Sequence, residues 1–470
     1  MKRRRLSLAV VASSAALAAA CVLNKPPDAA AIKAEGMPKV AVPPQWTAPG
    51  ATAASVGDGW LATFQDPALE AVVNEALANN ADLQVAASRV EVAMLQAKQA
   101  GARLYPSVDL LTRGGTKLSG DNSGLQGGLV TASWELDLWG RVRYGRAAAA
   151  ADAAATAADF AYARQSLAAL VAKSWFLATE ASLQAEVARG TVRDSDELVH
   201  LAETRARVGV GNDEDIYIAR ADAGTSRDLL RDIELSREQA LRALEIVVGR
   251  YPAAAATVSA SLPSQLPGVP AGLPSELLER RPDVVAAERR VAAAFNRIGE
   301  AKAARLPVIA LTSGVSTISS ELFFLKDHDN PVWNVGANLV MPLFRGGALK
   351  AQVEIRTAEQ KQAVAAYAAV GLRAFGEVEN ALATEIAARE REQILAQTLA
   401  DNRRAYDIVQ TQFRVGSSDL RFVTQRQLAL NITESALVRM QAEQRVQRVN
   451  LFLALGGSFD QPKPPAPRSH

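Results

Sequence analysis

The chain has 470 residues, of which 49% are hydrophobic and only 5% aromatic, and its 52 basic side chains nearly balance 50 acidic ones. Such a composition favours close-packed, alanine-rich helices over one thick aromatic core. The single cysteine, Cys21, excludes an intramolecular disulfide and a cysteine-based metal cluster, and three histidines leave little for zinc chemistry or histidine-based catalysis. The sequence also lacks a Walker-type phosphate loop and a helical zinc motif, so it has no motif for nucleotide hydrolysis or for a zinc site on a helix.

The chain begins with a segment typical of an export signal. Basic residues at positions 2 to 5 precede an apolar run of 15 residues, Leu6 to Ala20, which is short for a transmembrane helix. The run continues into Cys21, and Leu17-Ala18-Ala19-Ala20-Cys21 resembles a bacterial lipobox with Ala18 where leucine is usual. This pattern predicts a signal peptide over 1–20 and a lipid on Cys21, the only non-protein group expected. The alternative is ordinary cleavage that leaves a free thiol. Val22 rather than Asp follows the cysteine, which in such lipoproteins implies delivery to the outer membrane.

Both ends of the mature chain are rich in proline. Residues 21–57 are predicted to form a lipid anchor and an extended tether, and residues 458–470 a proline-rich tail. Cleavage would remove four of the 52 basic groups and no acidic one, which leaves 48 basic against 50 acidic groups. Since no basic block follows residue 5, nucleic acid is not an expected partner.

The region between these ends contains one sequence pattern twice. Residues recur at displacements of 201 and then 207 positions: Asp82, Arg89 and Pro106 as Asp283, Arg290 and Pro307, and Arg207-Val208-Gly209 as Arg414-Val415-Gly416. So small a drift places the extra residues in loops. We therefore predict two structural repeats, 58–262 and 263–457, each with the order helix, strand pair, very long helix, break, helix.

The long helices follow from the absence of proline between Pro106 and Pro252 and between Pro342 and Pro462. Apolar and small residues recur there with the helical period, as at Phe160, Leu167 and Leu170. A helix from about 147 to 206 is far longer than a globular domain needs, which favours a helical tube or a long coiled bundle. An ordinary alanine-rich bundle with hidden turns is the alternative.

Strand pairs are predicted at about 107–137 and 307–343. Apolar and polar residues alternate strictly in Val130–Asp137 and in Trp333–Leu339, as they do in strands with one lipid face and one wet face. Trp134 and Trp333 would then lie against lipid or at its interface. A soluble, half-buried sheet has the same period and remains an alternative. Because membrane barrels begin at about eight strands, four strands per chain imply a barrel shared by several copies, and three copies give about twelve strands.

Several segments together resemble a known family. These are Trp60-Leu-Ala-Thr-Phe64-Gln-Asp66-Pro67, Trp134-Glu135-Leu136-Asp137-Leu138-Trp139-Gly140-Arg141 and Leu278-Glu279-Arg280-Arg281-Pro282-Asp283-Val284. They are similar to signatures of the TolC-like outer membrane efflux proteins, in the lipoprotein (NodT/OprM-like) branch that serves pumps of the resistance-nodulation-division (RND) class. The resemblance implies an α+β fold made mainly of long α-helices. It also implies a homotrimer whose 12-stranded outer-membrane β-barrel continues into a periplasmic α-helical barrel.

The resemblance also implies a function. The chain would be the exit duct of a tripartite efflux system, lipid-anchored in the outer membrane and extending into the periplasm, and it would pass drugs or other small molecules without any chemistry. Its partners would be a periplasmic adaptor and an inner-membrane RND transporter. Two alternatives remain open: the outer-membrane channel of a type I protein-secretion system, and a non-conducting envelope scaffold lipoprotein. The alternating strands argue against the scaffold, because a lipid-anchored scaffold needs no barrel.

Gate residues are expected where each helical hairpin turns. The turns fall at Gly209 and Gly416, since glycine suits the left-handed conformation that ends a helix. In the family, carboxylates shortly after that glycine can ring a closed aperture, and Asp215 matches such a position, with Asp213 and Glu214 beside it. Simple charge stabilisation of a helix N-terminus is the alternative.

The second copy departs from this pattern. It has Phe422 and Gln425 where many relatives carry an acidic residue, and its Asp419 is expected to cap a helix. The gate is therefore predicted to combine one acidic ring with apolar closure by Phe422 or Ile216. Asp327-His328-Asp329 is interpreted as a solvated external loop, because three adjacent residues rarely converge on one ion.

Overall fold

The computed structural model of the chain describes residues 23–48, 56–113, 126–263, 266, 268–319 and 332–460. The predictions for the signal peptide, for the lipid on Cys21, for Asp327-His328-Asp329 and for residues beyond Asp460 lie outside these ranges. The chain divides into two compact units. The first, here the strand unit, comprises Met1–Val40, Ala87–Asp159 and Asp283–Val370. The second, here the hairpin unit, comprises Ala41–Ala86, Phe160–Pro282 and Gly371–His470.

Most of the described residues are helical. The helices in chain order are α2 (Ala29–Gly36), the short 3-10 helix η1 (Trp60–Phe64), α3 (Pro67–Asn79), α4 (Ala81–Ala102), α5 (Arg141–Arg207), α6 (Asp213–Val248), α7 (Pro274–Arg280), α8 (Pro282–Ala303), α9 (Ala348–Arg414) and α10 (Leu420–Ala454). The strands are β1 (Ser107–Arg113), β2 (Gln126–Leu136), β3 (Val308–Ser319) and β4 (Val332–Val340). Strands thus occupy both segments where the alternating pattern predicts them. Within the described ranges, no helix combines the length and apolar character that crossing a bilayer requires.

The element bounds repeat with the offsets seen in the sequence. Helices α4 and α8 have 22 residues each and begin 201 positions apart, at Ala81 and Pro282. Helices α5 and α9 have 67 residues each and begin 207 positions apart, at Arg141 and Ala348. The additional residues of the second copy therefore lie between α8 and α9, in the segment that holds the strand pair. The compact units do not coincide with the repeats, because each unit takes segments from both copies.

Helix α5 is continuous, so the alternative of hidden turns is wrong, and it begins earlier than the predicted residue 147. Its start is fixed by Asp137, whose carboxylate accepts hydrogen bonds from the backbone N–H groups of Val142 and Arg143, each at 2.9 Å. An ion pair between Glu135 and Arg141 adds a second link. Gly140 between them has a φ of 76°, a conformation that glycine adopts without strain. The Trp-Glu-Leu-Asp-Leu-Trp-Gly-Arg signature is therefore a strand end joined to a helix cap.

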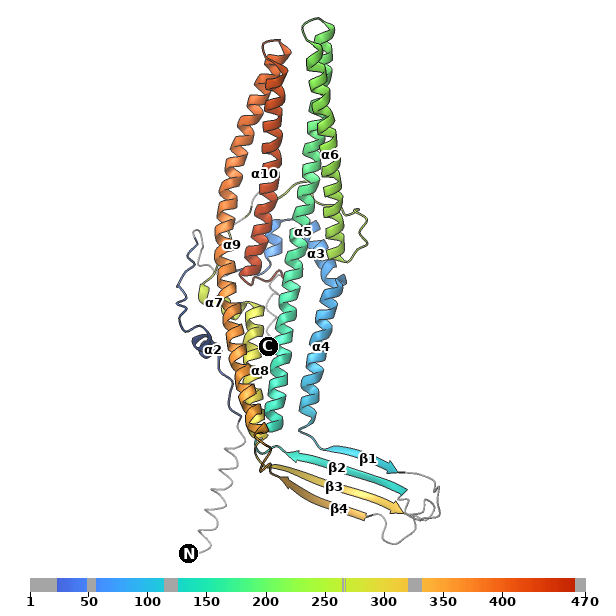
Figure 1. Ribbon diagram of the computed structural model, residues 1–470, viewed down its shortest axis with the longest axis vertical. Coiled ribbons are helices and arrows are strands. Elements are labelled where there is room, and N and C mark those ends of the chain that lie inside the picture. The colour runs from blue at the N-terminus through green and yellow to red at the C-terminus, as the bar shows by residue number, and fades with distance from the viewer. Residues whose placement is uncertain are drawn as a thin grey trace, which may run out of the picture. The chain divides into compact units, whose positions relative to one another are not determined.

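The strand unit holds one antiparallel sheet in the order β1-β2-β3-β4 (Figure 1). The two strand pairs join because β2 pairs with β3, and Trp134 lies opposite Leu311 there. Strand β3 in turn pairs with β4, and Val315 lies opposite Trp333. The indole of Trp134 also donates to the carbonyl oxygen of Leu104 at 2.9 Å. Strands β1 and β4 form the two edges of the sheet within the chain.

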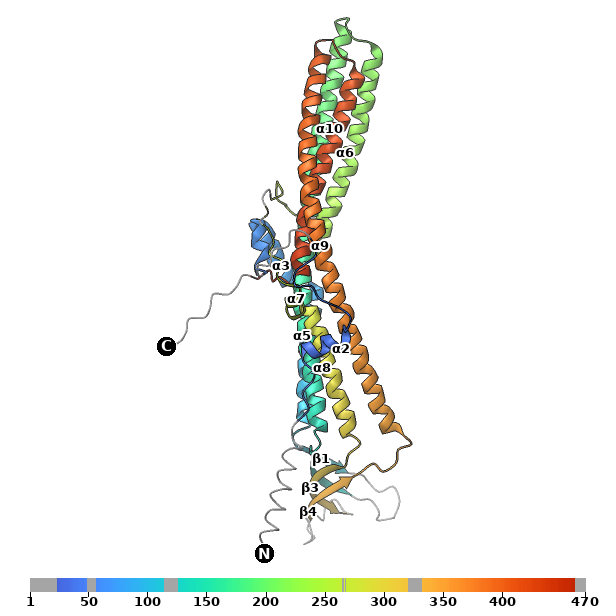
Figure 2. The same cartoon turned by 90° about the vertical axis from the view of Figure 1, so that its left-hand side faces the viewer.

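In the hairpin unit, the segment from Trp60 to Pro67 packs against the long helices α5 and α10. The ring of Trp60 stacks on that of Phe452 with centroids 5.7 Å apart. Asp66 accepts hydrogen bonds from the indole of Trp175 at 2.9 Å and from the hydroxyl of Ser259 at 2.7 Å, while its other oxygen caps α3. The Trp60 to Pro67 signature is thus a packing and capping element. In this unit α5, α6, α9 and α10 run side by side toward two turns (Figure 2).

The predicted extended tether over 21–57 is wrong in part, because its described residues pack against the protein. Helix α2 forms within it, and its Ile32 is fully buried in the strand unit. In the hairpin unit, Trp46 donates to the carbonyl oxygen of Ala271 at 3.0 Å, and the next two backbone N–H groups bind the carboxylate of Glu379. Ile32, Met37 and Trp46 are buried. Each of them buries apolar surface, which favours a packed segment despite the proline-rich composition.

The predicted tail over 458–470 is likewise packed at its start. Phe459 is buried, and the guanidinium of Arg164 lies 4.8 Å from the centre of its ring. Arg164 also pairs with Asp460 at 2.8 Å. The hairpin unit therefore extends at least to Asp460.

Candidate functional site

Both helical hairpins turn through glycine in the left-handed conformation. Gly209 has a φ of 78° and Gly416 a φ of 83°, as predicted for residues that end a helix. The sequence analysis missed Gly211, where an added Cβ would lie 2.8 Å from the backbone nitrogen of Ala206. The sequence Gly209-Val210-Gly211 could have indicated it, because two glycines so close together are typical of a tight turn. Nothing lies within 4 Å of a Cβ added at Gly209, so that position needs glycine for its backbone conformation alone.

The returning helices begin with side-chain caps. Asn212 accepts a hydrogen bond from the backbone N–H of Asp215 at 2.8 Å and so caps α6. Asp419 accepts from the backbone N–H of Arg421 at 3.0 Å and caps α10, as predicted. Because Asn212 is the cap, the carboxylates of Asp213, Glu214 and Asp215 occupy the first turn of α6. There they interact favourably with the helix dipole, but their oxygens are not needed as caps.

A cavity of about 950 Å³ lies between the two turns. This tip cavity brings together four of the predicted residues: Gly209, Gly416, Asp215 and Phe422. The other predicted residues lie elsewhere. Ile216 packs against the apolar cluster between the hairpins, Gln425 lines a separate groove, and Asp213 and Glu214 are exposed. Of the two apolar residues predicted for the gate, Phe422, which is 58% exposed, lines the tip cavity, and Ile216 does not.

The carboxylate of Asp215 is electrostatically disfavoured. Burial raises its pKa, the negative charge of Asp419 raises it further, and the guanidinium of Arg205 opposes both effects. The two copies therefore contribute one carboxylate each to the same cavity, although the sequence analysis gave Asp419 only a capping role. A site with two close carboxylates attracts cations and resists full ionisation.

Arg205 connects the two hairpins, and the sequence analysis did not identify it. Its guanidinium donates to the carbonyl oxygen of Phe413 at the end of α9 and, at 3.3 Å, to that of Val210 in its own turn. It also lies 4.4 Å from the centre of the Phe413 ring. Its Nε atom is buried without a hydrogen-bond partner in the described part of the chain. A cation at a helix C-terminus is favourable, so Arg205 ties the hairpins through charge, hydrogen bonds and stacking.

Two further contacts hold the hairpins together. Arg414 of α9 pairs with Glu197 of α5 at 2.9 Å. Behind it lies an apolar cluster of Leu198, Ala202, Ala219, Tyr406, Phe413, Leu420, Val423 and Leu430. Burial raises the pKa of Tyr406 to about 12, and nearby carboxylates add to the effect, so its hydroxyl stays neutral. The hairpins are therefore held together by the apolar cluster, by the Arg414–Glu197 ion pair and, at their turns, by Arg205.

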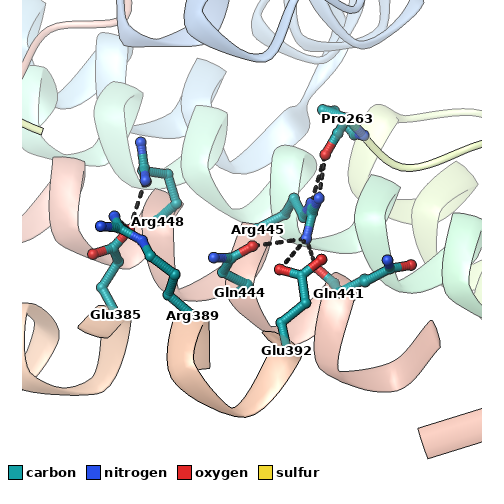
Figure 3. Close-up of polar contacts among 8 residues, drawn as sticks. All are labelled: Pro263, Glu385, Arg389, Glu392, Gln441, Gln444, Arg445 and Arg448. Atoms are coloured by element: carbon teal, nitrogen blue, oxygen red, sulfur yellow. Dashed lines mark hydrogen bonds and ion pairs between the residues drawn. The ribbon is translucent and has the colours of Figure 1, made fainter. Parts of the chain in front are cut away.

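Two buried arginines fix the other end of α10 against α9 (Figure 3). Arg448 is fully buried and donates to Glu385 at 2.6 Å, and Arg389 reaches the same carboxylate at 2.8 Å. Arg445, which is 1% exposed, binds the carbonyl oxygen of Pro263 through Nε at 3.0 Å and approaches Glu392. Burial lowers the pKa of both arginines. Buried charges tolerate few alternative partners, so these pairs specify the register of α9 against α10.

Nowhere in the described ranges do three or more His, Cys, Asp or Glu side chains gather as metal ligands would. The site instead combines a cavity, two carboxylates, one bridging guanidinium and an exposed phenyl ring. Such an arrangement attracts cations more than anions.

Comparison with known proteins agrees with this architecture. The family described as outer membrane efflux protein matches residues 72–250 and 273–457. The cation efflux system protein CusC of Escherichia coli O6:H1 is 30% identical over 420 residues, which cover 86% of this chain and 89% of CusC. The pyoverdine export outer membrane protein OpmQ of Pseudomonas putida is 30% identical over 443 residues, covering 90% of this chain and 94% of OpmQ. The crystal structure of the open state of the Neisseria gonorrhoeae MtrE outer membrane channel matches with a TM-score of 0.81 at 28% identity, covering 94% of this chain and 98% of MtrE. The chain belongs to the outer membrane efflux protein family.

Proposed function

We propose that the protein is the exit duct of a tripartite efflux system, a passive outer-membrane channel that conducts small molecules from the periplasm to the exterior. Its family membership supports this function. The observation that carries it is the presence in one chain of an open-edged sheet and of two long hairpins whose turns border a charged cavity. The first supplies part of a pore wall, and the second supplies a place to close it.

The sheet supports a shared barrel. Each edge strand, β1 and β4, has one partner within the chain, which leaves backbone groups on the outer edges available to a neighbour. On β4 the apolar residues Trp333, Val335 and Leu339 share one face, and all are more than 60% exposed, while Asn334 and Asn338 share the other. Lipid outside and water inside satisfy both faces. Three copies would close a barrel of about twelve strands, continued by a periplasmic helical barrel.

The tip cavity supports a periplasmic gate. Asp215 and Asp419 place negative charge beside Phe422, and Arg205 holds the two hairpins together. In a trimer these groups would recur around the axis, so that mutual repulsion of the carboxylates opposes closure while Arg205 and the apolar cluster favour it. A small shift of one hairpin would change that balance.

The remaining assignments concern partners and anchoring. We assign the lipid to Cys21, docking of the helical turns to a periplasmic adaptor, and the energy source to an inner-membrane RND transporter. The relatives are named for a cation and for pyoverdine, which differ greatly in chemistry. Cargo choice is therefore assigned mainly to the transporter, and the duct needs few directional contacts.

Single-channel conductance of the purified mature protein in a planar bilayer tests this proposal, together with its mass in detergent. We expect a trimeric mass and small, mostly closed, cation-selective currents. A monomer that never inserts would contradict the shared barrel and return the protein to a lipid-anchored scaffold. Large, ungated currents would support the shared barrel and contradict the proposed gate.

A further inference from the structure

A second cavity lies along α5, α6 and α10 of the hairpin unit, and we call it the side groove. Its volume is about 750 Å³, which is in the range of pockets that hold small organic molecules. Helix α5 provides its floor, and its apolar walls are Leu229, Ile233, Leu428 and Ile432. Three of these are about half exposed or more, at 52% for Leu229 and 60% for Leu428 and Ile432. The chain itself therefore leaves this apolar surface open.

The side groove continues the faces that line the tip cavity. On α6, Asp215 lines the tip cavity and Asp222 lines the side groove. Seven residues make about two helical turns, so both point to the same side of the helix. On α10, Phe422 lines the tip cavity and Gln425, almost one turn later, lines the side groove. If the tip cavity faces the conducting path, the side groove faces it too.

The polar floor of the groove is satisfied within the protein. Gln427 donates to the hydroxyl of Ser195 at 3.4 Å, the hydroxyls of Ser195 and Ser226 are 3.2 Å apart, and Ser226 donates to the carbonyl oxygen of Asp222 at 3.0 Å. Because Ser226 uses its proton on that carbonyl, Ser195 is the donor between the two serines. The hydroxyl protons of Ser195 and Ser226 are thus used within the protein, and the proposal below rests on the apolar walls and on charge.

Charge is distributed unevenly along the groove. Asp222 lies at the end near the turns, and it makes no ion pair with any other residue of the described ranges. Burial raises its pKa, and no positive charge offsets that effect. Arg439 lies at the far end, where its charge acts on Glu180 of the same unit. The groove thus has, at the end near the turns, a carboxylate without an ion pair in the described ranges, while the positive charge of Arg439 at the far end lies near the negative charge of Glu180.

We propose that the side groove is a low-affinity binding site in the duct wall for amphipathic cations. The apolar body lies along Leu229, Leu428 and Ile432, and the charged group faces Asp222. Residues 424 to 439 of α10 rise about 22 Å, enough for a flat molecule of several rings. The site rests on the proposed function, since it serves transit only if the groove faces the conducting path. Weak attachment suits a duct, which must release what it holds.

Ethidium, a flat and permanently charged aromatic cation, is a suitable probe for the full-length mature protein. Binding followed by fluorescence should weaken about two- to fivefold in Asp222→Asn, the effect of one partly exposed charge. Leu428→Asn should weaken it further. Asp228→Asn removes an exposed carboxylate of the same helix that does not line the groove, and it should leave binding unchanged. No binding, or equal loss in Asp222→Asn and Asp228→Asn, overturns the site.

Thiol labelling separates this site from the proposed function. Leu428→Cys should react with a soluble maleimide in the assembled protein, and ethidium should slow the reaction. A thiol that reacts only after denaturation means that a neighbouring copy covers the groove, which refutes the site even where single-channel currents are normal. Absence of currents with normal ethidium protection would instead refute the duct and leave the site standing as a binding site only.

Discussion

At the scale of single residues, one buried carboxylate organises the segment after α6. Glu245 is 3% exposed. It accepts hydrogen bonds from the backbone N–H groups of Ala254 and Ala255 at 2.7 Å and of Ala256 at 2.8 Å. Ala254 adopts a φ of 57°, which helps consecutive N–H groups point at one anion. Burial alone would raise the pKa of Glu245, but these N–H groups together lower it more.

We expect Glu245→Gln to lower the free energy of unfolding by about 2 kcal/mol near neutral pH, because charge-assisted hydrogen bonds become ordinary ones. A pKa lowered in the folded state stabilises above the unfolded value, and the contribution is lost as the pH falls through the folded value. The difference between wild type and variant should therefore shrink below about pH 4. Denaturant unfolding at several pH values measures it. Glu238→Gln, which breaks only an exposed pair with Arg242, is the control.

The proposed role of Asp215 in the gate can be tested by comparison with Gln425, the residue of the second copy that stands where many relatives carry an acidic one. Asp215→Ala should weaken block by divalent cations about fivefold and reduce cation selectivity, because Asp215 lines the tip cavity. Gln425→Ala should change neither property, since Gln425 lies outside that cavity. Because the pKa of Asp215 is raised, wild-type selectivity should fall at a higher pH than an ordinary aspartate allows, as acidification neutralises it. Equal effects of both variants in bilayer recordings would remove Asp215 from the gate.

At the scale of helices, the two hairpins are joined by Arg205 at their turns. Arg205→Lys keeps the charge but loses the planar fork that reaches two carbonyl oxygens and stacks on Phe413. We expect a higher open probability, about fivefold, which is worth about 1 kcal/mol of closed-state stability. Single-channel recording measures it. Arg207→Lys, exposed in the same last turn, should have no such effect, and an equal rise there would mean that the change does not depend on the contacts of Arg205.

The opposite end of the second hairpin depends on Glu385, which receives hydrogen bonds from two arginines. Glu385→Gln should lower the free energy of unfolding by about 3 kcal/mol, because it leaves Arg448 buried beside a neutral group. Thermal unfolding of the purified protein measures the loss. Glu390→Gln, at an exposed position five residues later on α9, is the matched control. A small loss in Glu385→Gln would mean that other groups already compensate the guanidinium.

Sequence patterns identified the helices and turns better than the contacts between them. The absence of proline and the Arg-Val-Gly repeats located α5, α9 and both turns, since these features act through the local backbone. The Asp137 cap was visible in the sequence but was not used, so α5 was predicted to begin too late. Arg205 and Phe413 are 208 positions apart, and no local pattern shows that they meet. The exposure of Phe422 and the partial burial of Ile216 also depend on packing between helices, which periodicity alone does not resolve.

At the scale of the whole molecule, the proposed lipid on Cys21 and the proposed barrel would be separate means of attachment. A protein with Cys21→Ser, exported by an ordinary signal peptide, should still form trimers and conduct in bilayers with unchanged unitary current. The reason is that insertion of the proposed barrel would depend on the apolar strand faces rather than on the proposed acyl chains. Mass measurement and conductance check this. A variant that becomes soluble without detergent would favour the scaffold alternative.

The duplication was evident in the sequence, whereas the compact units were not. Each unit draws on both copies, because the long helices of the two copies contribute to both. The sequence repeats reflect duplication of one segment of the chain. The compact units instead reflect which segments are in contact with one another. The boundary at residue 262 therefore separates two related halves of the sequence without separating two folded bodies.

The equal lengths of α5 and α9 constrain how such a protein can change over time. Both have 67 residues, and their bounds keep one offset of 207 from first residue to last. An insertion in one helix alone would rotate every later side chain out of its face and displace one turn from the other. A seven-residue insertion nearly preserves the faces, since it adds almost two full turns. Longer or shorter descendants of this chain should therefore arise through matched insertions or deletions in both copies, taken about seven residues at a time.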